Sequence, residues 1–143
     1  MMARGEGVVR ERRQGRALVV EDVMTSQPLT IGRAQPLLFA IAMMENHRSH
    51  HLPVLEHGEL VGVLSERELY FLEAVAGIDL QTRVVDDVMS TDTYAVAPDT
   101  PLDIVASTML KLRCGCAVVM ERQRVIGIFT PSDALRVLAA SPV

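Results

Sequence analysis

An internal repeat without gaps constrains this chain more than any other feature of its sequence. When residues 19–70 are placed against residues 84–135, 12 of the 52 positions are identical, whereas unrelated sequences would share about 3 or 4. A copy of roughly 60 residues buries little apolar surface alone, so the two copies are expected to share a core about a pseudo-twofold axis. The sequence therefore predicts a tandem duplication.

Each copy contains an apolar strand that runs through a hydroxyl residue into a helix. In the second copy, residues 125–129 form the strand, Thr130 has the chemistry of a helix N-cap, and Asp133 falls at N3, where it completes a capping box. Free amide groups and the helix dipole at such a corner attract phosphate, and the carboxylate can accept from ribose hydroxyls. An isolated pair of this kind is more often only a cap. The first copy repeats the pattern with Ser65 and Glu68.

Hydrophobic periodicity and turn residues predict the order β-α-β-β-α in each copy, after a short leading segment. The fold class is therefore α/β (α+β). We expect a basic N-terminal tail over residues 1–17, a first copy over 18–77, a linker over 78–83 and a second copy over 84–140. The expected elements are leading segments at 19–24 and 84–89, strands at 28–31, 51–55, 60–64, 94–97, 116–121 and 125–129, and helices at 36–46, 65–77, 101–112 and 130–140.

Composition narrows the class of protein. The longest apolar run has eight residues, 37–44, far below the roughly 20 that span a bilayer. Residues 1–16 lack the apolar core of a signal peptide, and only two cysteines are present, so we expect a cytoplasmic protein without a membrane partner. Five arginines give residues 1–16 a local charge of +3, while the net charge of the chain is −4. The acidic remainder disfavours a nucleic acid partner.

The motifs of both copies together resemble a known family. The leading segments V-x-D-V-M, the strand L-P-V-L and the corner G-I-F-T-P-S-D are similar to those of tandem CBS domains, the pair called a Bateman module, over about residues 18–140. The resemblance implies a stand-alone regulatory sensor without catalytic activity or a required cofactor. It also implies a homodimer that binds AMP, ADP, ATP or S-adenosylmethionine between the repeats and signals to a separate effector protein.

The resemblance also implies two composite sites. The preferred site uses the corner of the second copy for ribose and phosphate, and residues of the first copy around the base: Ile128, Thr130, Ser132 and Asp133 with Met24, Leu29, Ser49 and His50. The related site uses Val63, Ser65, Arg67 and Glu68 with Met89, Tyr94, Cys114 and Gly115. It is expected to be weaker, because Glu68 replaces the family's aspartate and its longer side chain displaces the carboxylate.

Three other functions remain open on the sequence. His50, His51, Cys114 and Cys116 align across the repeat and offer a ligand set for zinc, although their spacing matches no common zinc motif. The same cysteines and histidines could serve a nucleophilic enzyme, but no motif arranges them for that chemistry. A degenerate module that only dimerises would have eroded phosphate corners, whereas one corner here is intact and the other is nearly so.

Overall fold

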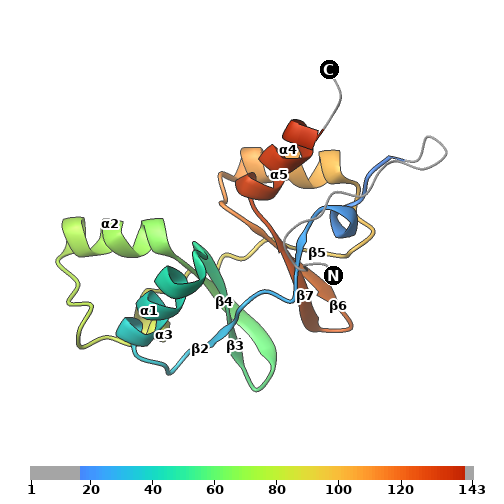
Figure 1. Cartoon of the computed structure of the whole chain (residues 1–143). Helices are drawn as coiled ribbons and strands as arrows, with labels where there is room; N and C mark the ends of the chain where they lie inside the picture. The colour runs from blue at the N-terminus through green and yellow to red at the C-terminus, as the bar shows by residue number, and fades with distance from the viewer. Residues whose placement is uncertain (1–16, 141–143) are drawn as a thin grey trace. The chain divides into compact units, whose positions relative to one another are not determined.

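The duplicated sequence folds around two small mixed sheets (Figure 1). The computed structural model describes residues 17–140 and divides them into two compact units. The β3–β4 unit comprises Leu29–Thr93, and the β6–β7 unit comprises residues 17–28 and 94–140. The α+β class and the order of elements in each copy are as predicted. The basic segment at residues 1–16 lies outside the described residues.

The β3–β4 unit has a three-stranded sheet in the order β2-β3-β4, with β2 parallel to β3 and β4 antiparallel to it. The tight turn between β3 and β4 places His57 at φ 53° and Gly58 at φ 82°, a left-handed conformation that glycine adopts without steric cost. The elements are β2 (Ile31–Gly32), α1 (Leu37–His47), β3 (His51–Glu56), β4 (Glu59–Ser65), α2 (Glu66–Ala76) and α3 (Val85–Val88).

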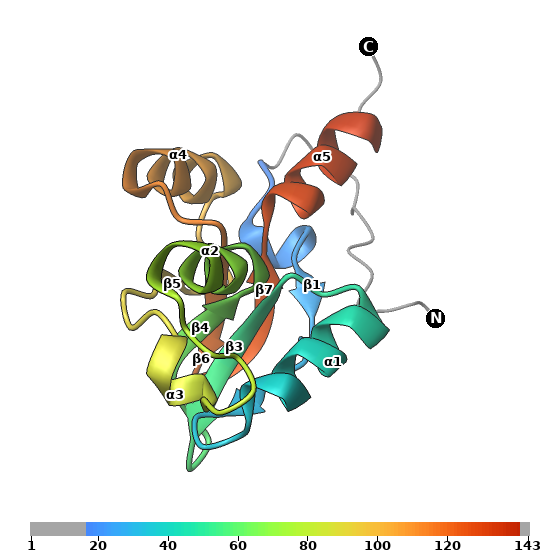
Figure 2. The ribbon, with the colours of Figure 1, turned by 90° about the vertical axis from the view of Figure 1, so that its left-hand side faces the viewer.

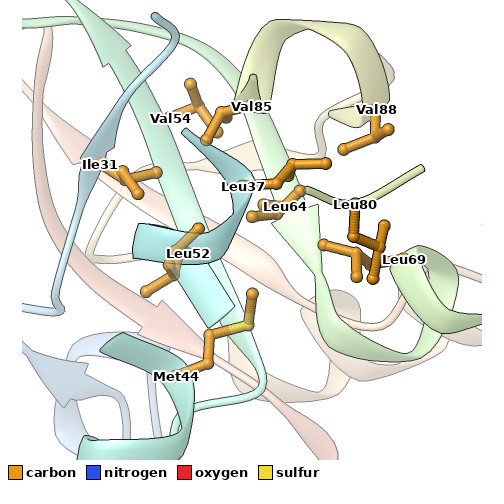
Figure 3. Close-up of a cluster of buried hydrophobic side chains, with 11 residues drawn as sticks. Ile31, Leu37, Met44, Leu52, Val54, Leu64, Leu69, Leu80, Val85 and Val88 are labelled. Atoms are coloured by element: carbon orange, nitrogen blue, oxygen red, sulfur yellow. The ribbon is translucent and has the colours of Figure 1, made fainter. Parts of the chain in front are cut away.

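Helices α1 and α2 lie on the same side of this sheet (Figures 1 and 2). Figure 3 shows Leu37 and Met44 of α1 directed at the face that carries Leu52 and Leu64, with Leu69 of α2 beside them. All five side chains are at most 1% exposed. The apolar spacing of α1 in the sequence therefore marks the face that packs on the sheet.

The β6–β7 unit has a four-stranded sheet in the order β1-β7-β6-β5. Strand β1 is antiparallel to β7, and β5 is parallel to β6. The elements are the 3₁₀ turn η1 (Val20–Asp22), β1 (Thr25–Ser26), β5 (Ala95–Val96), α4 (Leu102–Leu112), β6 (Ala117–Glu121), β7 (Arg124–Phe129) and α5 (Pro131–Ala140). Among residues 17–140, no helix has the length and apolar character needed to cross a membrane.

Two sequence predictions about local structure were wrong. Most of the strand expected over residues 28–31 does not form: residues 27–30 connect β1 to β2, and only Ile31 is in a strand, because Gln27 bends the chain at φ 50° and Pro28 offers no amide donor to a ladder. The apolar spacing of Leu102, Val105, Met109 and Leu112 also predicts one buried stripe on α4, and this stripe ends one turn early. Val105 and Met109 are buried, but Leu112 is 57% exposed where the helix ends in a left-handed cap at Arg113.

Each leading segment is hydrogen-bonded to the body of the other copy. Residues 18–28 bind the second copy and residues 83–93 bind the first, so the compact units divide the chain differently from the sequence repeats. The bonds obey the repeat: Val20 N to Thr100 O at 2.9 Å corresponds to Val85 N to Gln35 O at 2.9 Å, and Leu102 N to Leu18 O at 3.0 Å to Leu37 N to Arg83 O at 3.0 Å.

Repeated methionine and glycine pairs let these segments approach the sheets closely. A Cβ atom built on Gly127 would lie 2.9 Å from Met24 Cε, and one built on Gly62 would lie 2.8 Å from Met89 Sδ and 2.7 Å from the carbonyl oxygen of Ser90. Met24 therefore packs on Gly127, and Met89 packs on Gly62. The repeat thus conserves the same methionine–glycine contact once in each unit.

Candidate functional site

The corner between β7 and α5, residues 130–133, is built around a buried carboxylate. Asp133 is 1% exposed. Its Oδ2 atom accepts from the Thr130 amide at 3.0 Å and from the Thr130 hydroxyl at 3.3 Å. The backbone half of the predicted capping box is thus present. The Thr130 hydroxyl, however, donates to the carboxylate instead of accepting from the helix.

The other carboxylate oxygen is held by two residues that the sequence reasoning missed. Asp133 Oδ1 accepts from the hydroxyl of Thr25 at 2.9 Å and is paired with the guanidinium of Arg136. Thr25 lies in β1, opposite Ile128 in β7, so the sequence separation of 108 residues concealed it. The i, i+3 spacing of Asp133 and Arg136 was visible in the sequence and could have predicted their pairing.

The structure brings five residues of the preferred site into the β6–β7 unit. Asp133 and Thr130 form the corner, Ile128 is buried in β7, Ser132 is exposed on the first turn of α5, and Met24 is 7% exposed against Gly127.

The remaining three residues predicted for this site belong to the β3–β4 unit. Leu29 is 36% exposed, the Ser49 hydroxyl donates to the His51 carbonyl at 3.1 Å, and the His50 ring lies 2.8 Å from the Glu66 carboxylate.

The related corner, residues 65–68 between β4 and α2, is open. The Ser65 hydroxyl accepts from the Glu68 amide at 3.4 Å, which is the cap that the sequence predicts. The Glu68 carboxylate is exposed and makes no hydrogen bond or ion pair with residues 17–140. Val63 exchanges two backbone hydrogen bonds of 2.9 Å with Ser90. In the repeat, this pair corresponds to Ile128 and Thr25, which also lie opposite each other.

The other residues predicted for the related site are divided between the units. Met89 packs against Gly62, and Arg67 is exposed on α2. Tyr94, Cys114 and Gly115 lie in the β6–β7 unit, where Tyr94 and Cys114 pack against the apolar core.

The titratable residues of the zinc hypothesis are mostly in their neutral forms. Burial raises the pKa of the Cys116 thiol to about 12 and raises that of the Cys114 thiol, so neither is a thiolate at pH 7. Burial, with the nearby His50, lowers the pKa of His51. Within residues 17–140, no three or more histidine, cysteine or acidic side chains gather in a metal-binding group.

Comparisons with known proteins agree with the fold. The CBS domain family matches residues 20–73 and 85–140. YhcV, a CBS domain-containing protein of Bacillus subtilis (strain 168), is 29% identical over 114 residues, which are 80% of this chain and 81% of the relative.

Two solved structures have the same fold. One is the CBS domain pair of protein MJ0100 in complex with 5′-methylthioadenosine and S-adenosyl-L-methionine, with a TM-score of 0.78 at 25% identity. The matched region covers 87% of this chain and 98% of the MJ0100 chain. The other is Hypoxic Response Protein I with two coordinated zinc ions, with a TM-score of 0.72 at 21% identity. The matched region covers 87% of this chain and 100% of that protein's chain. The resemblance seen in the sequence is confirmed: the chain belongs to the CBS domain family and carries a tandem pair of CBS domains.

Proposed function

We propose that this CBS pair is a regulatory module that binds an adenosine-containing ligand chiefly at the Thr130–Asp133 corner. The observation that carries the proposal is the buried Asp133 carboxylate, set one turn inside α5 and surrounded by hydroxyl and amide groups. The complex of MJ0100 with 5′-methylthioadenosine and S-adenosyl-L-methionine supports the same ligand class. The proposed role is regulatory and not catalytic.

The chemistry of the corner suits a nucleoside. The vicinal ribose hydroxyls would donate to Asp133, where hydroxyl and guanidinium groups of the chain donate now. The exposed first turn at Ser132 and the α5 dipole would attract a phosphate. Met24 and Ile128 supply apolar atoms beside the corner. The roles of Leu29, Ser49 and His50 at the base remain predictions from the family resemblance.

The Ser65–Glu68 corner is proposed as the weaker site. Its open carboxylate offers acceptors without displacing a donor of the chain, and Arg67 adds a positive charge. The longer glutamate side chain, however, loses more conformational freedom when it binds a diol, which lowers the affinity of this site for the ribose. The contributions of Val63, Met89, Tyr94, Cys114 and Gly115 remain predictions.

Regulation would proceed through association with a second copy. Apolar side chains are exposed on the helices that cover the sheets, including Leu135 and Leu138 on α5 at 64% and 69% exposure. A second copy would remove this apolar surface from water. A ligand that binds two geometries of the dimer with different affinities shifts their populations, and a separate effector protein would sense that shift.

Zinc is the alternative ligand, since Hypoxic Response Protein I coordinates two zinc ions. In this chain, the raised pKa values of Cys114 and Cys116 oppose the thiolate form that zinc requires. We therefore propose the nucleotide in preference to the metal.

A thermal-shift titration of the full chain tests this function with AMP, ADP, ATP, S-adenosylmethionine and zinc. A ligand at about 100 times its dissociation constant should stabilise the fold by roughly 2.7 kcal/mol. Asp133→Asn preserves the shape of the side chain and should abolish the shift, while Asp99→Asn, an exposed control in the same unit, should retain it. Stabilisation by zinc alone, or an equal nucleotide shift in Asp133→Asn, would contradict the proposal.

A further inference from the structure

The Asp133 carboxylate is already saturated by donors of its own chain. An ionised carboxylate offers about four acceptor positions. Oδ1 accepts from Thr25 and Arg136, and Oδ2 accepts twice from Thr130. A ribose diol therefore has no vacant acceptor at Asp133, and at least one donor of the chain must leave when a nucleoside enters.

Of these donors, Arg136 has the longest and most exposed side chain, so it leaves most readily. The Thr130 amide is fixed by the start of α5, and its hydroxyl stands on the same residue. Thr25 belongs to β1, which is paired with β7. Arg136 ends a long side chain that is 45% exposed, so its guanidinium can rotate into solvent. The ligand and Arg136 thus compete for the same carboxylate oxygen.

We infer that Arg136 selects phosphate-bearing nucleosides at this corner, an inference that rests on the proposed function. When ribose displaces the guanidinium, the cation loses its carboxylate partner. A ligand phosphate next to α5 restores an ion pair, so the exchange conserves charge pairing. A neutral nucleoside, such as adenosine or 5′-methylthioadenosine, displaces Arg136 without replacing its partner. The contact with Asp133 therefore penalises neutral ligands more than phosphorylated ones.

The related corner lacks this device. Phe71 stands where the repeat places Arg136, and Glu68 stands where it places Asp133. Phe71 is 59% exposed, and an aromatic ring neither pairs with a carboxylate nor follows a phosphate. Selection by an arginine that the ligand displaces from the carboxylate is thus specific to the Thr130–Asp133 corner.

Isothermal titration of the full chain with AMP and with adenosine tests the inference. In the wild type, AMP should bind about tenfold or more tightly than adenosine, and added salt should reduce the ratio. Arg136→Gln should tighten adenosine binding and weaken AMP binding, so that the ratio falls at least threefold toward the preference that the α5 dipole alone supplies. Arg136→Lys, which keeps the charge but not the planar fork, should give an intermediate ratio. Arg124→Gln, an exposed arginine of β7, is the matched control and should leave the ratio unchanged.

The outcomes separate the two proposals. Equal affinities of the wild type for AMP and adenosine would overturn the role of Arg136 and leave the proposed function in place. Equal losses of both ligands in Arg136→Gln, with unfolding by urea unchanged, would also overturn it, because the arginine would then only shape the corner. Absence of binding by both AMP and adenosine would overturn the role of Arg136, and absence of binding by ADP, ATP and S-adenosylmethionine as well would overturn the proposed function.

Discussion

The paired methionine and glycine residues give the sharpest test of how the leading segments attach. In Gly62→Ala, the new methyl group meets the Ser90 carbonyl oxygen at 2.7 Å and Met89 Sδ at 2.8 Å. The carbonyl belongs to the backbone and accepts, from the Val63 amide, one of the two 2.9 Å hydrogen bonds between Val63 and Ser90. Overpacking and the weakening of these bonds should lower the free energy of unfolding by about 2–4 kcal/mol.

The corresponding substitution Gly127→Ala should cost less. The three atoms nearest to its new methyl group are Sδ, Cε and Cγ of Met24, which all belong to the side chain. A flexible methionine can change rotamer, so we expect a loss of about 1–2 kcal/mol. The two glycines occupy the same repeat position, which makes each variant the control for the other.

Double-mutant cycles measured by urea denaturation separate the two mechanisms. Met24→Ala removes the three atoms nearest to the Gly127→Ala methyl group, so the second substitution should cost under about 0.5 kcal/mol in that background. Met89→Ala leaves the Ser90 carbonyl in place, so Gly62→Ala should remain costly there. Full rescue of Gly62→Ala by Met89→Ala, or no rescue of Gly127→Ala by Met24→Ala, would refute this account of the packing.

Three further predictions concern the corner, a buried histidine and the helices that cover the sheets. Asp133→Ala should lower the free energy of unfolding by about 2–4 kcal/mol in urea without any ligand, because donors to a buried carboxylate lose their acceptor; a loss below 0.5 kcal/mol would contradict the network. The lowered pKa of His51 means that the unfolded chain binds its proton first, so stability should fall as pH drops below about 6.5, by at most about 1.4 kcal/mol per pH unit. His51→Gln should flatten that slope, and an unchanged slope would assign it to other groups. Leu138→Glu should convert a dimer to a monomer in sedimentation velocity without lowering the stability of the monomer. An unchanged molar mass would show that Leu138 on α5 does not contribute to a dimer interface.

The sequence predicted most of the fold because its signals are local and occur twice. Helix starts at Pro36 and Pro101 and the corners at Ser65 and Thr130 needed only neighbouring residues. The short strands β1 and β2, on either side of residues 27–30, were missed because each depends on pairing with a strand that is distant in the sequence. The exchange of leading segments was missed for the same reason, since a repeat in the sequence does not say which copy a segment packs against.

The candidate corner was only partly predictable. Asp133 and Thr130 were identified from their spacing, but the sequence suggested an open acceptor for a ligand. The burial of Asp133 and its bond to Thr25 depend on the pairing of β1 with β7, which joins residues that are far apart in the chain. Arg136 was within reach of the sequence, because a helix places residues i and i+3 on one face.

A crystal structure of the full chain grown with AMP would show directly whether Asp133 binds the ribose. We expect ribose hydroxyls within about 3.2 Å of the Asp133 carboxylate, with the Arg136 guanidinium released from it and turned to the phosphate. AMP bound away from the Thr130–Asp133 corner, with Asp133 still paired to Arg136 and Thr25, would contradict it.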